Sequence, residues 1–145
     1  MTNRTDPPTE ARLLVHGGGV LPGLPESISN VRDLIRTLVG DSPTIEDALL
    51  VATEVATNAV LHTRSGLPGG TFTIYAEVRA AGDTRTLHLR VHDEGPRTTQ
   101  HDDPRPADQR GRGLMLVDAL ASRWGMEPRT PGHVVWLELD WKEAE

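Results

Sequence analysis

Residues 43–62, PTIEDALLVATEVATNAVLH, form the stretch that most constrains the fold. Apolar residues recur there at helical spacing and cover most of the circumference of the predicted helix, which leaves one polar stripe. Such a helix has to pack against other elements on most of its sides, so it predicts a layered domain. The polar stripe contains Glu54, Asn58 and His62, each one helical repeat after the previous one.

The remaining sequence alternates between helical and strand patterns. Ser42 is the predicted N-cap of the long helix, with Pro43 in its first turn. The other predicted elements are a short strand over 12–16 that three glycines end, a helix over about 26–39, strands over 71–80 and 85–93, a helix over 113–124 and a hairpin over 125–141. This order predicts an α+β fold, a two-layer sandwich with helices on one face of a mixed, largely antiparallel sheet.

Length and composition limit the class of protein. A chain of 145 residues suits one domain, so we expect a disordered tail over 1–10 and a single domain over 11–145. The absence of cysteine excludes disulfides, zinc–thiolate sites and cysteine nucleophiles. A net charge of -6 disfavours a nucleic-acid partner. No apolar run is long enough for a membrane span or a signal peptide, so a cytoplasmic location is expected.

Glu54 and Asn58 have two explanations. Taken alone, they suit a solvated helix edge, or hydrogen bonds to nearby backbone. The alternative is a functional site, because a buried carboxylate without a partner is costly and usually pairs or shifts its pKa.

Two further motifs bear on that choice. The strand over 85–93 ends in Asp93, whose carboxylate accepts hydrogen bonds and suits an exocyclic amino group, and Gly95 follows, where a flat ligand could approach the backbone. Gly111 and Gly113 flank Arg112 at the start of a predicted helix, where free backbone N–H groups attract phosphate. Each motif alone is equally compatible with an ordinary turn or helix start.

The order of the three motifs is more specific than any one of them. EVATNAVLHT, VHDEGP and GRGLMLVDAL together resemble the Bergerat-fold (GHKL) superfamily of gyrase, heat-shock chaperone, histidine kinase and mismatch-repair ATPases. Within it, they are most similar to the bacterial anti-sigma-factor serine kinase group and to small stand-alone ATP-binding proteins of actinomycetes. The resemblance covers about residues 20–140 and implies ATP and Mg²⁺ as cofactors.

The resemblance also implies roles for single residues. Asn58 would bind Mg²⁺, and Glu54 would be the general base that takes the proton from an attacking serine hydroxyl. Asp93 would accept a hydrogen bond from the adenine amino group, with Gly95 beneath the base. His62 receives no chemical role.

The phosphates would be held at the start of the second motif helix. By resemblance, Gly111, Arg112, Gly113 and Leu114 would contact them, and residues 96–110 would form a lid. Two positions depart from the pattern of the group. Arg97 stands where many relatives have glycine, and Val134 stands where relatives often have threonine, which puts nucleotide affinity in question.

The implied function is an ATP- and Mg²⁺-dependent serine/threonine protein kinase that acts as an anti-sigma factor. It would phosphorylate a serine of an anti-anti-sigma (STAS) protein, sequester a sigma factor and possibly form a homodimer. An ATP-binding regulatory module without phosphoryl transfer is the alternative, because the same pocket serves both. A histidine-kinase fragment is disfavoured, since no helix with a phosphoacceptor histidine precedes the domain.

Two other site types are less well supported. His88 and His92 lie on one face of a predicted strand, but His101 and Asp102 have no fixed relation to them, which disfavours a histidine metal site. A serine hydrolase is disfavoured because the serines lack a base at useful spacing.

Overall fold

The computed structural model of the chain describes residues 11–96 and 112–143. The predicted tail over 1–10 and all of the predicted lid except Pro96 lie outside these residues. The elements, in chain order, are β1 (Arg12–Pro22), α1 (Glu26–Val39), α2 (Ile45–His62), the short 3-10 helix η1 (Arg64–Gly66), β2 (Thr71–Ala81), β3 (Thr84–His92), α4 (Arg112–Leu120), β4 (Arg123–Pro128) and β5 (His133–Lys142).

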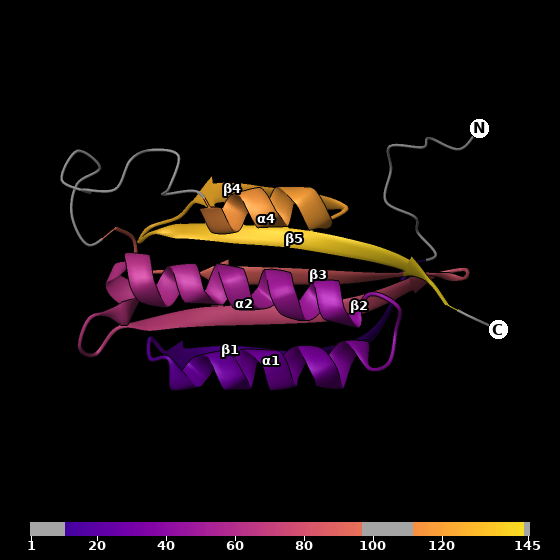
Figure 1. The fold of residues 1–145 in the computed structure, drawn as a ribbon, viewed down its shortest axis with the longest axis horizontal. Coiled ribbons are helices and arrows are strands. Elements are labelled where there is room, and N and C mark those ends of the chain that lie inside the picture. Colours follow the sequence, from indigo (N-terminus) through magenta and orange to yellow (C-terminus); the bar gives the residue numbers. More distant parts are fainter. Residues whose placement is uncertain (1–10, 97–111, 144–145) are drawn as a thin grey trace.

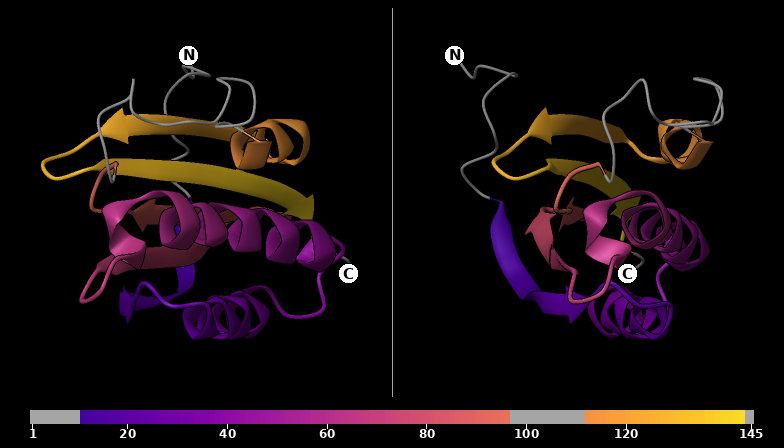
Figure 2. Two further views of the ribbon diagram at one scale, coloured as in Figure 1. Left: turned by 60° about the vertical axis from the view of Figure 1, so that its left-hand side comes forward. Right: turned by 90° about the vertical axis from the view of Figure 1, so that its left-hand side faces the viewer.

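The five strands form one sheet in the order β1-β2-β3-β5-β4 (Figure 1). All four strand pairings are antiparallel, so the described sheet is not mixed. The helices α1, α2 and α4 lie side by side on one face of this sheet (Figures 1 and 2). The predicted α+β sandwich with helices on one face is therefore confirmed.

The core lies between the helices and the sheet. The strands alternate buried and more exposed side chains, as expected for a sheet with one covered face. The buried apolar residues of β2, β3 and β5 are Phe72, Ile74, Ala76, Val78, Ala80, Leu87, Leu89, Val91, Val134, Val135, Leu137, Leu139 and Trp141. The long helix α2 contributes Ala48, Val51, Ala52, Val55, Ala56, Ala59 and Val60, mostly small residues that allow close packing on the sheet.

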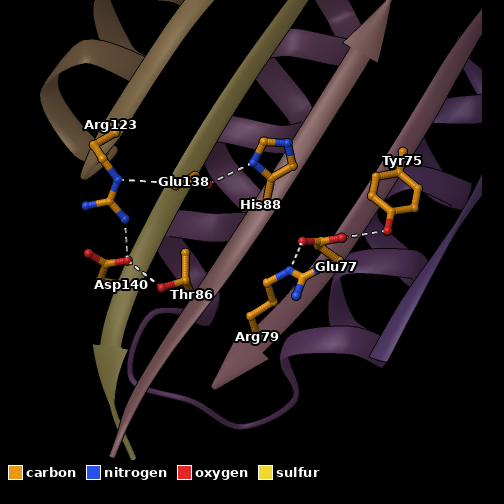
Figure 3. Close-up of polar contacts among 8 residues, drawn as sticks. All are labelled: Tyr75, Glu77, Arg79, Thr86, His88, Arg123, Glu138 and Asp140. Atoms are coloured by element: carbon orange, nitrogen blue, oxygen red, sulfur yellow. Dashed lines mark hydrogen bonds and ion pairs between the residues drawn. The ribbon is translucent and has the colours of Figure 1, made fainter. Parts of the chain in front are cut away.

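The other face of the sheet carries polar and charged side chains (Figure 3). Arg123 donates to Oε1 of Glu138 at 2.8 Å and to Asp140 at 2.7 Å, and Nδ1 of His88 lies 2.9 Å from Oε2 of Glu138. The Thr86 hydroxyl donates to the same oxygen of Asp140 at 2.7 Å. These contacts tie β3, β4 and β5 together on the side that no helix covers.

The strand β1 is longer than the sequence predicted. The expected strand ended at the glycines, whereas β1 continues through them to Pro22, with Gly17, Gly18 and Gly19 opposite Ala76, Tyr75 and Ile74 of β2. Glycine is a poor strand former in isolation, but a neighbouring strand that supplies the ladder of hydrogen bonds overrides this weak local preference.

Two helix ends also differ from the prediction. The long helix begins at Ile45 with Thr44 as its N-cap residue, while the Ser42 hydroxyl accepts the Thr44 N–H at 3.3 Å. The helix α4 ends at Leu120, because Arg123 and the residues after it pair with β5. The limits of α1 match the prediction. No helix in the described part of the chain combines the length and apolar character needed to cross a bilayer.

Candidate functional site

Three segments that are distant in the sequence meet at one end of the sandwich. They are the C-terminal end of α2, the residues after β3 and the N-terminal end of α4 (Figures 1 and 2). The backbone N–H of Arg64 donates to the Gly95 carbonyl at 2.7 Å, and Thr63 forms an isolated bridge with Pro96. The helices α2 and α4 pack against each other. This end of the molecule therefore contains all three sequence motifs.

Glu54 and Asn58 lie on α2 at the border of the core. Both are half-buried, whereas their neighbours Val55, Ala56 and Ala59 are buried. Among the described residues, neither the Glu54 carboxylate nor the Asn58 amide makes a hydrogen bond or an ion pair. The predicted hydrogen bonds to nearby backbone are thus not found there, and the stripe can interact with solvent or with a ligand.

Asp93 and Gly95 form a tight turn after β3. Oδ1 of Asp93 accepts the Gly95 N–H at 2.7 Å, and the Asp93 N–H donates to the His133 carbonyl at 3.0 Å. Within the described residues, Oδ2 of Asp93 has no hydrogen bond. Gly95 is buried and has φ +96°, a conformation that glycine adopts readily. The turn fixes the carboxylate and leaves one of its oxygens able to accept.

A set of hydroxyl groups joins this turn to the end of α2. The fully buried Ser65 hydroxyl accepts the Glu94 N–H at 3.0 Å. The Thr63 hydroxyl donates to the Ala59 carbonyl at 2.7 Å and accepts the Ser65 N–H at 3.0 Å. The Glu94 carboxylate in turn accepts from the backbone and hydroxyl of Thr71, both at 3.4 Å. The sequence gave Ser65 only as a candidate nucleophile, although T-x-S after a helix is a hydroxyl pattern typical of such turns.

The turn between β4 and β5 supports the Asp93 turn from the other side. A Cβ atom on Gly132 would lie 2.1 Å from the Asp93 carbonyl and 2.7 Å from the Gly95 nitrogen. Only glycine fits at this contact, and no motif in the sequence pointed to it. Nε2 of His92 lies 2.7 Å from the Pro131 carbonyl. Val134 pairs with His92 and is 8% exposed, so the position noted as a departure from the group lies beside the Asp93 strand.

The third motif is described only in part. Gly111 lies outside the described residues, and α4 begins at Arg112, with Gly113 and Leu114 in its first turn. Leu114 is half-buried and packs against the core. A depression of about 400 Å³ lies beside α4. Its lining residues are Leu114, Met115, Asp118 and Trp124. Because none of them comes from α2 or the Asp93 turn, this depression is distinct from the end where the motifs meet.

The histidines do not gather with other ligands in the described part of the chain. His88 is engaged by Glu138 and His92 by a backbone carbonyl. Among these residues no group of three His, Asp or Glu side chains is placed to hold a metal ion. His101 and Asp102 lie outside the described residues.

Comparisons with known proteins agree with the convergence of the motifs. A family model described as a histidine kinase-like ATPase domain matches residues 21–139, which is most of the chain. An uncharacterised protein of Streptomyces coelicolor is 40% identical over 89 residues, which cover 59% of this chain and 78% of that protein.

Proposed function

The chain belongs to the histidine kinase-like ATPase domain family, a family of ATP-binding domains, and from this premise we propose that it is a protein serine/threonine kinase of the anti-sigma-factor type. The observation that carries the proposal is the polar stripe of α2. Glu54 and Asn58 are half-buried and without partners among the described residues, and the same helix ends against the Asp93 turn. A base, a metal ligand and an adenine acceptor thus belong to one end of the molecule.

Asp93 would recognise the adenine of ATP. Its Oδ1 is held by the Gly95 N–H, while Oδ2 is open to accept the exocyclic amino group of the base. Gly95 has no side chain that would keep the flat ring from the backbone. A guanine presents an oxygen at the corresponding position, and the carboxylate would repel it. The turn therefore favours ATP over GTP.

Asn58 would hold Mg²⁺ through its side-chain oxygen. The donor set fits this ion, because Mg²⁺ prefers oxygen ligands and retains several waters, so that one or two protein ligands suffice. The bound ion would neutralise charge on the phosphates. At the N-terminal end of α4, Gly111, Arg112, Gly113 and Leu114 would contribute backbone N–H groups and the charge of one arginine to the phosphates.

Glu54 would be the general base of phosphoryl transfer. Its carboxylate would take the proton of a substrate serine hydroxyl, whose oxygen forms a bond to the γ-phosphorus as the bond to the bridging oxygen of ADP breaks. The acceptor would be a serine of an anti-anti-sigma (STAS) protein. The phosphate adds almost two negative charges to the docking surface, which would break that complex and free the kinase to bind a sigma factor.

A binding module without phosphoryl transfer is the second candidate. It would use the same adenine and metal contacts, and it would respond to ATP by binding partners alone. The two functions differ only in whether Glu54 acts as a base.

Transfer of radiolabelled phosphate from ATP to STAS proteins of the source genome tests the choice. We expect wild-type protein to label a serine, and Glu54→Gln to bind Mg-ATP normally but to lose at least about a hundredfold in rate, as removal of a general base typically does. Glu46→Gln is the matched control, because Glu46 is exposed in the first turn of the same helix. Equal labelling by wild type and Glu54→Gln would contradict the base assignment, and no labelling of any STAS protein would favour the binding module.

A further inference from the structure

The strand β1 forms one edge of the sheet. It pairs with β2 on one side, and no described strand pairs with its other side. In an antiparallel pair, about half of the residues direct their backbone N–H and C=O groups away from the partner strand. With 11 residues, β1 presents a row of such groups over roughly 35 Å. A long open edge of this kind is a template for pairing with a further strand.

The side chains of β1 lack the features that usually protect an edge. Leu13 is 40% exposed, Leu14 39%, Val15 41% and Val20 65%. The strand carries no lysine, and its proline comes only at its last position. The register shift between Leu13 and Val15 is its one irregularity. Apolar residues this exposed on an unprotected edge indicate that something covers it.

The opposite edge of the sheet shows the contrast. The strand β4 has six residues, ends in Pro128 and carries Arg123 and Glu127. Short length, charge and proline are the devices by which natural proteins prevent pairing at an edge. The same sheet therefore has one protected edge and one open edge, and the difference is specific to β1.

The order of residues along β1 is nearly symmetric about its glycines. Leu13, Leu14 and Val15 precede the glycine triplet, and Val20 and Leu21 follow it. An antiparallel partner with the same sequence would set apolar residues against apolar residues at both ends. We propose that β1 pairs with β1 of a second copy of this chain, so that two sheets join into one across a two-fold axis at Gly17.

The centre of the proposed interface suits this register. Val15 of one copy lies opposite Gly19 of the other, and His16 lies opposite Gly18, so that each larger side chain meets a residue without one. Leu13 and Leu14 then come close to Val20 of the second copy. Because α1 packs against β1 on the covered face, the two copies of α1 lie next to each other across the same axis and extend the contact. The interface is remote from Asp93, so it does not depend on the proposed function.

Cysteine cross-linking tests the register, because the natural chain has no cysteine. A Cβ on Gly19 meets no atom within 4 Å, so Gly19→Cys is tolerated, and Val15 is well exposed. Within one strand these positions are roughly 14 Å apart, too far for a disulfide, whereas across the axis they face each other. The full chain with Val15→Cys and Gly19→Cys together should form a disulfide-linked dimer under mild oxidation, and each single variant should form far less.

Sedimentation of the wild-type chain over a range of micromolar concentrations tests the association itself. We expect a dimer, with its association weakened more than about tenfold by Val20→Lys, which places a charge on each copy near the apolar contact. Met126→Lys is the matched control, because Met126 is 50% exposed on the protected edge strand β4, and it should leave the dimer unchanged. A wild-type monomer, which would leave the edge to a different partner, overturns the proposal, and so does a dimer that Val20→Lys does not weaken.

Discussion

Ser65 shows how much of the site depends on residues that carry no chemistry. Its hydroxyl is completely buried and accepts the N–H of Glu94, next to Asp93. Through Thr63 it is also connected to the last turn of α2. One small side chain therefore sets the position of the adenine turn relative to the helix with Glu54 and Asn58. Burial and a contact 29 residues away in the chain decide this role, and neither can be read from local sequence.

Ser65→Ala should lower the free energy of unfolding by about 1–3 kcal/mol, because it leaves the Glu94 N–H without its acceptor in a partly buried place. It should also weaken ATP binding, since the Asp93 turn loses its anchor. Denaturant unfolding and calorimetric titration measure the two effects. Ser29→Ala is the control, because Ser29 is exposed on α1. An unfolding free energy like that of the control would argue against the anchor.

Glu138 predicts a dependence of stability on pH. The hydrogen bond with His88, together with that from Arg123, lowers the pKa of Glu138 from 4.5 to about 2, against the opposing effect of burial. A depressed carboxylate pKa stabilises the folded state above the unfolded pKa of 4.5, and this stabilisation is lost as pH falls towards 2.

Glu138→Gln should therefore be less stable than wild type by about 1–2 kcal/mol at neutral pH, a modest value because solvent screens a partly exposed network. The difference should shrink between pH 4.5 and pH 2. Unfolding in denaturant at several pH values measures it. A difference that stays constant with pH would mean that the charge of Glu138 contributes nothing.

At the scale of elements, helices with a clear apolar period were predicted best. The limits of α1 and the end of α2 follow from spacing, Gly40 and the break after Thr63. The failures have tertiary causes. Pairing with β2 extends β1 through three glycines, and pairing with β5 takes Arg123 and Trp124 from the predicted last helix. Local preferences worth fractions of a kcal/mol cannot oppose a ladder of hydrogen bonds.

The short helix η1 gives a prediction about packing between elements. A Cβ on Gly70 would lie 2.4 Å from the carbonyl oxygens of Arg64 and Ser65, which are backbone atoms and cannot move easily. Gly70→Ala should therefore displace η1, destabilise the fold by about 1–3 kcal/mol and weaken ATP binding through the Asp93 turn. Gly19→Ala, which meets no atom within 4 Å, should be neutral in both assays. Similar values for the two variants would show that η1 does not support the site.

At the scale of the molecule, the sheet order is what brings the motifs together. The strand β5 lies beside β3, so the turn before β5 reaches the Asp93 turn, and Gly132 fits against it. The sequence predicted the α+β class and the ordered motifs, because both are local patterns. It could not predict Gly132 or the link from α2 to Asp93, because these contacts exist only after the chain has folded.

Calorimetric titration of Mg-ATP into the wild-type chain and into Asp93→Asn tests the central claim most directly. The amide can still accept the Gly95 N–H through its oxygen, so the turn is preserved, but it offers a donor where the adenine amino group needs an acceptor. We predict that wild type binds Mg-ATP more tightly than Mg-GTP, and that Asp93→Asn loses at least about tenfold in affinity for Mg-ATP. Equal affinity of the two proteins for Mg-ATP would contradict the assignment of this end of the molecule as the nucleotide site.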